Sequence, residues 1–315
     1  MSKGKERATA WPVLLAAVGA VLLGSAGIAC AQLIEPNEYV PAPNGTSLNL
    51  NYFVFGHEDA FIDAHGTNIP NSSANAFIGV ERFAHFLYVF GHPAGFLVTE
   101  AFGSISNSTV GGTNLGTANG VSNPNLSAFF FPYSDLEQKE ELVVTAFLYP
   151  PLGTYDNTKS VNFATQYQPN GQYNWTGDLQ IGWEQGIGDR FSYDAAFDAR
   201  FFGNTTGPIQ PGIPLSVTMH HDPDYRLQLW ATWEWNPALR TAIGYQGFFG
   251  GLDYFSTPLT GTVDTGKSFE QQLRGAVIMW FSPQIQTVLE VNGDVARTGG
   301  FKQTFGTILR FAYIF

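Results

Sequence analysis

Charged side chains that could contact a solute recur in the second half of the chain. Arg200 and Arg226 lie on either side of one long polar stretch, and no acidic residue is evident opposite them. Rings of charged side chains set the selectivity of pores. Arg200 and Arg226 are therefore our first candidates for contact with a polar or anionic solute.

The same alternating segments carry charges of both signs, which leaves a second interpretation open. The candidates for an inner wall are Asp178, Glu184, Asp194, Asp198, Arg200, Arg226, Glu234, Arg240, Glu270, Arg274, Glu290 and Arg310. Opposite charges on adjacent strands can simply neutralise one another, and we favour this interpretation for most of them. From their heights in the strands we predict two pairs, Glu234 with Arg240 and Glu290 with Arg310.

Phenylalanines occupy consecutive positions at 129–131 and at 248–249. Because successive side chains of a strand point to opposite faces, each run must place an aromatic ring on both faces. We predict that Phe130 and Phe248 face inward and form an apolar path for hydrophobic solutes. Packing of these rings against a plug or a loop is the alternative.

Histidines offer the remaining candidate chemistry. His220 and His221 are adjacent in a polar stretch, but neighbouring residues of an extended chain point apart, so we predict no metal site there. A serine hydrolase built on strands needs a serine and a histidine at the same height on neighbouring strands. Only His85 lies well inside a predicted strand, and no serine partner is evident. We therefore predict no catalytic residue, no metal and no cofactor.

These residues must be positioned by β-strands. The alternation of apolar and polar side chains that is typical of a strand is clearest in the last fifteen residues. In Phe301–Phe315 the odd positions are mostly aromatic or aliphatic, whereas the even positions include Lys302 and Arg310. A soluble edge strand with so apolar a face would be an aggregation hazard, whereas a strand facing lipid is not. The aromatic C-terminal residue resembles the signal that outer-membrane barrels present to their assembly machinery. We therefore expect an outer-membrane barrel that this machinery recognises through its last strand.

The sequence contains about twelve segments with this alternation, and the last of them is this strand. They are 45–56, 74–90, 93–103, 125–132, 139–149, 172–186, 189–203, 224–236, 238–250, 268–281, 285–294 and 301–315. Long polar stretches alternate with short turns between them, as in outer-membrane barrels. The fold class is therefore all-β, a transmembrane antiparallel β-barrel of about twelve strands with both termini in the periplasm. A barrel of this size lies between filled barrels and wide aqueous channels, which predicts a narrow passage.

The N-terminus predicts export. Basic residues, an apolar run and the triplet Ala29-Cys30-Ala31 indicate a signal peptide over residues 1–31, cleaved after Ala31. A lipoprotein signal at Cys30 is disfavoured, because Gly27 stands where a large aliphatic residue is needed. Residues 32–44 then form an N-terminal extension, and residues 45–315 form the barrel.

Composition agrees with this prediction. Aromatic residues make up 15% of the chain, charged residues only 13%, and there are 35 glycines. Loss of the leader removes the single cysteine, so we expect neither a disulfide nor thiolate chemistry. It also makes the net charge of −11 more negative by two, because the leader carries three basic residues and Glu6. Such a charge argues against nucleic acid as a partner.

The stretch 147–156 resembles a known family, the outer-membrane proteins labelled "putative MetA-pathway of phenol degradation". Members carry Pro-Pro-x-Gly-x-Tyr-Asp after a mid-chain strand, which here is Pro150, Pro151, Gly153, Tyr155 and Asp156. The resemblance covers most of the mature chain and is strongest over 139–203. It implies an exported barrel that is connected by name with uptake of aromatic compounds, and it assigns no residues that contact a substrate. Segment 104–124 departs from the family pattern, and folding of this segment into the lumen would argue against an open pore.

We therefore expect a passive outer-membrane transporter or channel for small solutes, aromatic compounds among them. The expected partners are outer-membrane lipid, the barrel assembly machinery and the small-molecule solute. A structural or adhesive barrel with partner-binding loops is the alternative, and an outer-membrane hydrolase is the least favoured one. A conductive lumen would distinguish the first hypothesis from the second.

Overall fold

The computed structural model describes residues 34–154, 174–208, 216–257 and 261–315. The predicted signal peptide, Cys30 and the end of the family motif at Tyr155 and Asp156 lie outside these residues. Within the described part of the chain, no helix is both long and apolar enough to cross a membrane.

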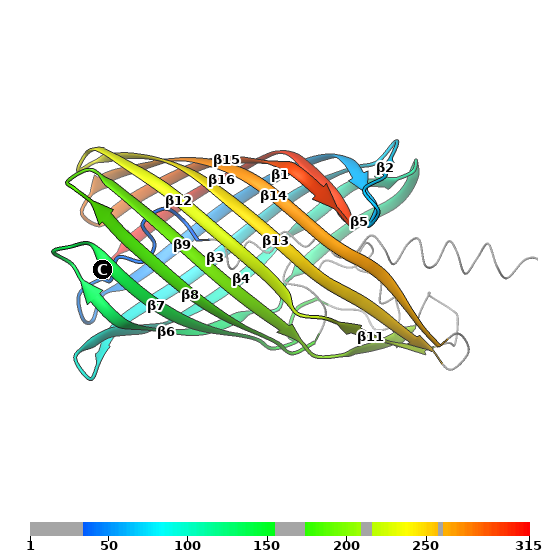
Figure 1. The fold of residues 1–315 in the computed structure, drawn as a ribbon, viewed down its shortest axis with the longest axis horizontal. Coiled ribbons are helices and arrows are strands. Elements are labelled where there is room, and N and C mark those ends of the chain that lie inside the picture. The colour runs from blue at the N-terminus through cyan, green and yellow to red at the C-terminus, as the bar shows by residue number, and fades with distance from the viewer. Residues whose placement is uncertain (1–33, 155–173, 209–215, 258–260) are drawn as a thin grey trace, which may run out of the picture.

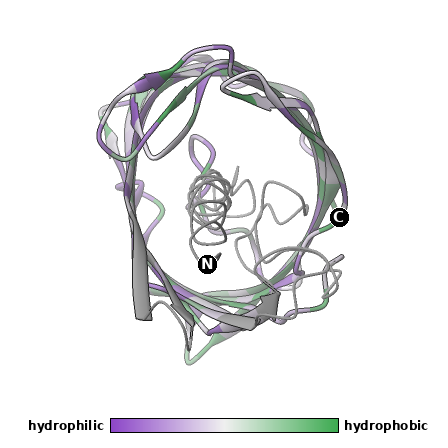
Figure 2. Ribbon diagram, turned by 90° about the vertical axis from the view of Figure 1, so that its right-hand side faces the viewer, coloured by the Kyte–Doolittle hydropathy of each residue, from purple (hydrophilic) through white to green (hydrophobic). Residues whose placement is uncertain are grey.

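Twelve antiparallel strands form a closed barrel, which confirms the predicted fold class (Figure 1). They are β1 (Ser47–Ile62), β3 (Ser73–Val89), β4 (His92–Val110), β6 (Asn125–Asp135), β7 (Glu140–Tyr149), β8 (Thr176–Ile187), β9 (Phe191–Phe202), β12 (Asp224–Asn236), β13 (Leu239–Thr257), β14 (Gly261–Ser282), β15 (Ile285–Thr298) and β16 (Gly300–Ile314). Each strand pairs with its neighbours in this order, and β16 pairs with β1 from Leu48↔Ile314 to Ile62↔Gly300. Viewed along its axis, the sheet is a ring around a lumen (Figure 2).

The two ends of the barrel differ in their connections. At one end, which we call the turn end, short links join the strands at 90–91, 136–139, 188–190, 237–238 and 283–284. Phe90 and Gly91 both have positive φ, 53° and 84°, as a two-residue type I′ hairpin requires. The opposite end, which we call the loop end, carries the long connections. Outer-membrane barrels direct short turns to the periplasm and long loops outward.

Four short strands extend the loop end. They are β2 (Asn68–Ile69), β5 (Thr113–Val121), β10 (Thr205–Pro208) and β11 (Ser216–His221). The prediction of a loop at 104–124 was wrong: β4 continues to Val110, and β5 returns along it as a hairpin. This segment therefore lengthens the wall of the barrel.

The alternation of side chains matches the predicted faces over most of the last strand. Phe305, Phe311 and Tyr313 are exposed on the outside, whereas Arg310 is buried inside. Phe301 departs from this pattern, because irregularities in the pairing near Glu58 shift the register between β1 and β16. Its ring is buried against Phe61, with ring centroids 5.3 Å apart.

Charges on the inner wall form cross-strand pairs. The predicted pair of Glu234 and Arg240 is confirmed, with Oε2 and Nη2 3.0 Å apart. The predicted pair of Glu290 and Arg310 is wrong: Glu290 binds Arg274 instead, through two bonds of 2.8 Å from Nε and Nη2. The guanidinium of Arg310 donates to the side chain of Gln286.

Replacing Arg274 by Met should lower the free energy of unfolding by roughly 3–5 kcal/mol, because it leaves the carboxylate of a fully buried ion pair uncompensated. The matched change Arg240→Met breaks a partly exposed pair and should cost at most about 1 kcal/mol. Urea unfolding of the refolded barrels in lipid vesicles, followed by tryptophan fluorescence, measures both values. Equal losses in the two variants would contradict this ranking.

Candidate functional site

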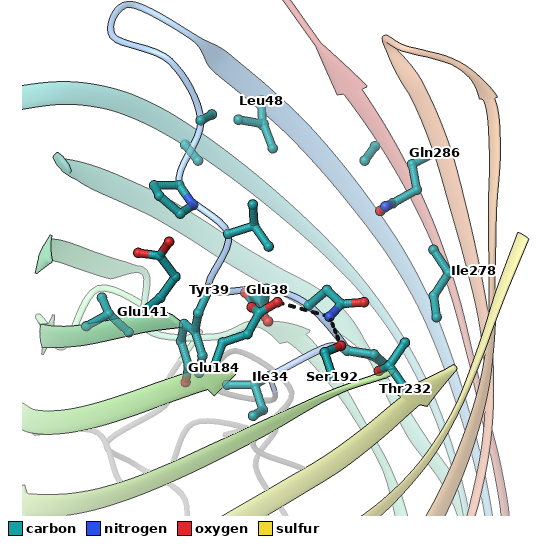
Figure 3. A pocket seen from close by; sticks show the side chains of 18 of the residues that line it. Ile34, Glu38, Tyr39, Leu48, Glu141, Glu184, Ser192, Thr232, Ile278 and Gln286 are labelled. Atoms are coloured by element: carbon teal, nitrogen blue, oxygen red, sulfur yellow. Dashed lines mark hydrogen bonds between the residues drawn. The ribbon is translucent and has the colours of Figure 1, made fainter. Parts of the chain in front are cut away.

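The N-terminal segment, residues 34–46, enters the lumen from the turn end (Figure 3). It leads from the start of β1 to Ile34, which is buried beside the middle of β12. Its hydrogen bonds go to inward-facing side chains of β3, β8, β9, β12 and β13. The segment therefore occupies space that an open pore would need.

Ile34 is held at the inner end of the segment. Its amide donates to Oε1 of Gln228 at 3.0 Å, and its carbonyl accepts from Nε1 of Trp230 at 3.0 Å. The Arg274 guanidinium lies 4.5 Å from the centre of the Trp230 ring and also donates to Gln228. The segment is thus joined to the buried layer that contains the Arg274–Glu290 pair.

Asn37 makes four hydrogen bonds with the inner wall. Its φ of 60° is left-handed, a conformation that asparagine adopts more readily than most residues. Its amide N–H donates to Asp194 at 3.1 Å, and its side-chain Nδ2 donates to Glu184 at 3.0 Å and to Ser192 at 2.7 Å. Its side-chain oxygen accepts from Arg240 at 3.3 Å.

The next two residues fix the segment to β3 and β8. Glu38 accepts from Nη1 of Arg82 at 2.7 Å, and the Tyr39 hydroxyl donates to Gln180 at 3.0 Å. The Tyr39 ring lies over Gly182, where an added Cβ would come within 2.4 Å of it. A glycine is needed at this position because any larger side chain would overlap the ring.

A cavity of about 510 Å³ lies between the segment and the wall (Figure 3). Most of its lining is apolar and includes Leu48, Leu50, Ala84, Phe86, Leu97, Phe129, Phe131, Val143, Phe147 and Ile278. Charged residues line it as well. Lys139 and Arg190 belong to the connections at the turn end, and the strands contribute Arg82, Glu141, Glu184, Glu234, Arg240 and Arg310. This volume is in the range of sites that hold small organic molecules. Among the described residues there is no group of three side chains suited to hold a metal ion.

Arg200 and Arg226 lie on the inner wall near the loop end and are both buried. The expectation that no acid stands opposite them was wrong. In the strand register Arg200 is opposite Asp178 and Asp224, and Arg226 is opposite Asp198. Nε of Arg200 lies 3.7 Å from Oδ2 of Asp178.

The two candidate phenylalanines have opposite orientations. Phe248 faces inward, with the Arg226 guanidinium 5.7 Å from the centre of its ring. Phe130 faces outward and is 36% exposed, whereas Phe129 and Phe131 are buried inside. The prediction that Phe130 faces the lumen was therefore wrong. The sequence held a usable signal, because Asn125 and Ser127 of the same strand share the inner face with Phe129 and Phe131.

The histidines are used in local contacts. Nδ1 of His220 lies 2.8 Å from the Asn204 side chain, and Nε2 of His221 lies 2.8 Å from Asp224. His85 has the serine partner that the sequence did not reveal, with Ser47 Oγ 2.9 Å from Nδ1. Within the described part of the chain, no hydrogen bond joins a carboxylate to His85.

The residues that receive the N-terminal segment were only partly identified from the sequence. Glu184 and Asp194 belong to the predicted inner wall, whereas Gln180, Gln228 and Trp230 were not singled out. One usable signal was present, since Ile34 and Tyr39 stand in a polar, proline-rich stretch before the first strand. Such large side chains need a buried surface to pack against.

The change Gly182→Ala should weaken docking of the N-terminal segment by about 1–3 kcal/mol, because the new methyl group overlaps the Tyr39 ring. Single-channel recordings in a planar bilayer should then show a higher or more fluctuating conductance than the unmodified protein. The control is Gly177→Ala on the same strand, where an added Cβ meets no atom within 4 Å. Wild-type conductance in both variants would mean that Tyr39 does not hold the segment.

Comparison with solved structures supports the fold. The COG4313 outer membrane channel from Pseudomonas putida F1 has a TM-score of 0.77 at 20% identity, over 90% of this chain and 100% of that one. The transport unit of the Escherichia coli autotransporter AIDA-I has a TM-score of 0.53 at 10% identity, over 95% and 97%. The Ralstonia pickettii toluene transporter TbuX has a TM-score of only 0.46 at 11% identity, over 87% and 90%, too low to support an argument.

Sequence comparisons give two further results. No curated protein matches the chain. Residues 58–311 match the model of one family of proteins. This match spans well over half of the chain, which also has the fold of an outer-membrane β-barrel channel. The chain therefore belongs to the family described as "Putative MetA-pathway of phenol degradation".

Proposed function

We propose that this protein is a passive outer-membrane transporter for small, mainly apolar solutes, aromatic compounds among them. The observation that carries the proposal is the apolar cavity of about 510 Å³ between the N-terminal segment and the barrel wall. Phenylalanine rings and aliphatic side chains from several strands meet there, and the site has the size and lining of a small-molecule pocket.

The state of the lumen argues against a general pore for hydrophilic solutes. The N-terminal segment crosses the lumen and is anchored to side chains of five strands. The charges around it are largely paired, as in Arg82 with Glu38 and Arg274 with Glu290. A wall of paired charges presents no ring of one sign that would select ions.

Arg200, Arg226 and Phe248 remain proposed contacts for a solute that enters from the loop end. The acids opposite the arginines remove most of their net positive charge. We therefore expect the two arginines to donate hydrogen bonds to neutral polar groups more readily than to attract anions. Phe248 offers an aromatic surface beside them.

We also propose a route to the membrane. The signal peptide is cleaved after Ala31, and the assembly machinery recognises the last strand, Phe301–Phe315.

Replacing Ala84 by Trp should lower the uptake of aromatic hydrocarbons several-fold, because the indole ring would fill the cavity that Ala84 lines. Uptake of radiolabelled toluene by bacterial cells that carry the protein in their outer membrane, compared with cells that lack it, is the measurement. Phe83→Trp is the control, since this neighbouring side chain lies on the outer face of β3.

Uptake in wild-type cells no faster than in cells without the protein would overturn the proposal and favour a structural or adhesive barrel. Equal loss of uptake in both variants would show that the cavity is not on the route.

A further inference from the structure

Three buried carboxylates form a row across the inner wall near the turn end. Glu141 on β7 is directly opposite Glu184 on β8, which is directly opposite Asp194 on β9. All three side chains face the lumen, with residues only 1–2% exposed. Like charges in directly opposite positions destabilise a sheet unless something compensates for them. A row of this kind therefore needs hydrogen-bond donors, cations or a proton shared between two of the acids.

The N-terminal segment supplies donors to two of the three acids. Asn37 donates to Asp194 through its amide and to Glu184 through its side chain. Neither carboxylate oxygen of Glu141 accepts a hydrogen bond of normal geometry, although the residue is 1% exposed and the Ser134 hydroxyl stands opposite it on β6. Buried polar atoms are nearly always paired, so an unpaired buried carboxylate indicates a missing donor.

The arginines of the nearby strands are bonded to other groups, and Lys139 and Arg190 lie in exposed turns. Arg240 binds Glu234 at 3.0 Å, and Arg82 binds Glu38 at 2.7 Å. Lys139 lies in the exposed turn before β7, and its ammonium donates to a backbone carbonyl at 3.4 Å. Among the described residues, none forms an ion pair with Glu141.

Glu141 also lines the apolar cavity, as Figure 3 shows. On its own strand it is followed on the same face by Val143, Thr145 and Phe147, which line the cavity as well. Four carboxylates line the cavity beside its apolar body, from Glu38, Glu141, Glu184 and Glu234. Glu38 and Glu234 pair with arginines and Glu184 accepts from Asn37, so among these four Glu141 is the one without such a partner. A protonated amine offers up to three N–H donors and a positive charge, which is the complement of this arrangement.

We propose that Glu141, with Glu184 beside it, is the subsite for the ammonium group of a solute whose remaining part is apolar. The ligand class is a primary amine that carries an aromatic ring or an alkyl chain. The ammonium group replaces the missing donor at Glu141, and the apolar part occupies the space beside Phe131 and Phe147. This inference rests on the proposed transport function, since it uses the same cavity.

Binding of four phenyl compounds of similar size separates this proposal from a purely apolar cavity. Isothermal titration of the complete mature protein in lipid nanodiscs would use 2-phenylethylamine, 2-phenylethanol, ethylbenzene and 3-phenylpropionate. The amine should bind most tightly, and the carboxylate should bind least, because it would meet Glu141 and Glu184.

The change Glu141→Gln should weaken binding of the amine on the order of tenfold, because a charged hydrogen bond is lost, and should change binding of ethylbenzene little. Glu141→Asp keeps the charge and should retain the preference for the amine. The matched control is Glu140→Gln, since Glu140 is the preceding residue on the outer face of β7 and should leave binding unchanged. The temperature at which each barrel loses its fast migration in detergent gels checks that all variants are folded.

Equal affinity for the amine and the alcohol, or equal effects of the Glu140 and Glu141 changes, would overturn the proposal. Failure of this inference is distinguishable from failure of the transport function. In the first case cells still take up toluene faster than cells without the protein, and only the preference for amines is absent. In the second case that uptake is absent as well.

Discussion

The hydrogen bonds between β1 and β16 close the sheet, and the rest of the structure depends on that closure. A lipid bilayer offers no partner to a free backbone N–H or carbonyl group, so a strand that crosses it must be paired on both sides. Closure also divides every strand into two faces with different solvents. The outer face carries exposed aromatic and aliphatic side chains, and the inner face carries nearly all of the buried charges.

The enclosed polar wall creates a second requirement, since its carboxylates, amides and guanidinium groups must find partners inside the barrel. Arg274 with Glu290 meets this requirement between strands. The N-terminal segment meets it for Gln228, Asp194 and Glu184, so it acts as part of the inner wall. Much of the lining of the space that the segment leaves unfilled is apolar, and Glu141 is a carboxylate in that lining that accepts no hydrogen bond of normal geometry. These two properties lead to the two proposals about solutes.

Much of the barrel could be predicted because a strand repeats every two residues. The twelve strands, their order and the outward faces of Phe311 and Tyr313 follow from that period and from the positions of the long polar stretches. The prediction was wrong where the period is absent or interrupted. Phe130 lies in a run of three phenylalanines, and Phe301 follows an irregular stretch of pairing near Glu58.

The fold class, the approximate strands and the residue types of the inner wall could therefore be read from the chain, since these depend on local alternation and composition. Which residues share a height across strands became known from the folded barrel, because each register is fixed by turns, bulges and closure far along the chain. This is why Arg200 and Arg226 face acids that could not be foreseen. It is also why Ile34 and Asn37 could be placed among strands about 150 to 200 residues later only from contacts in space.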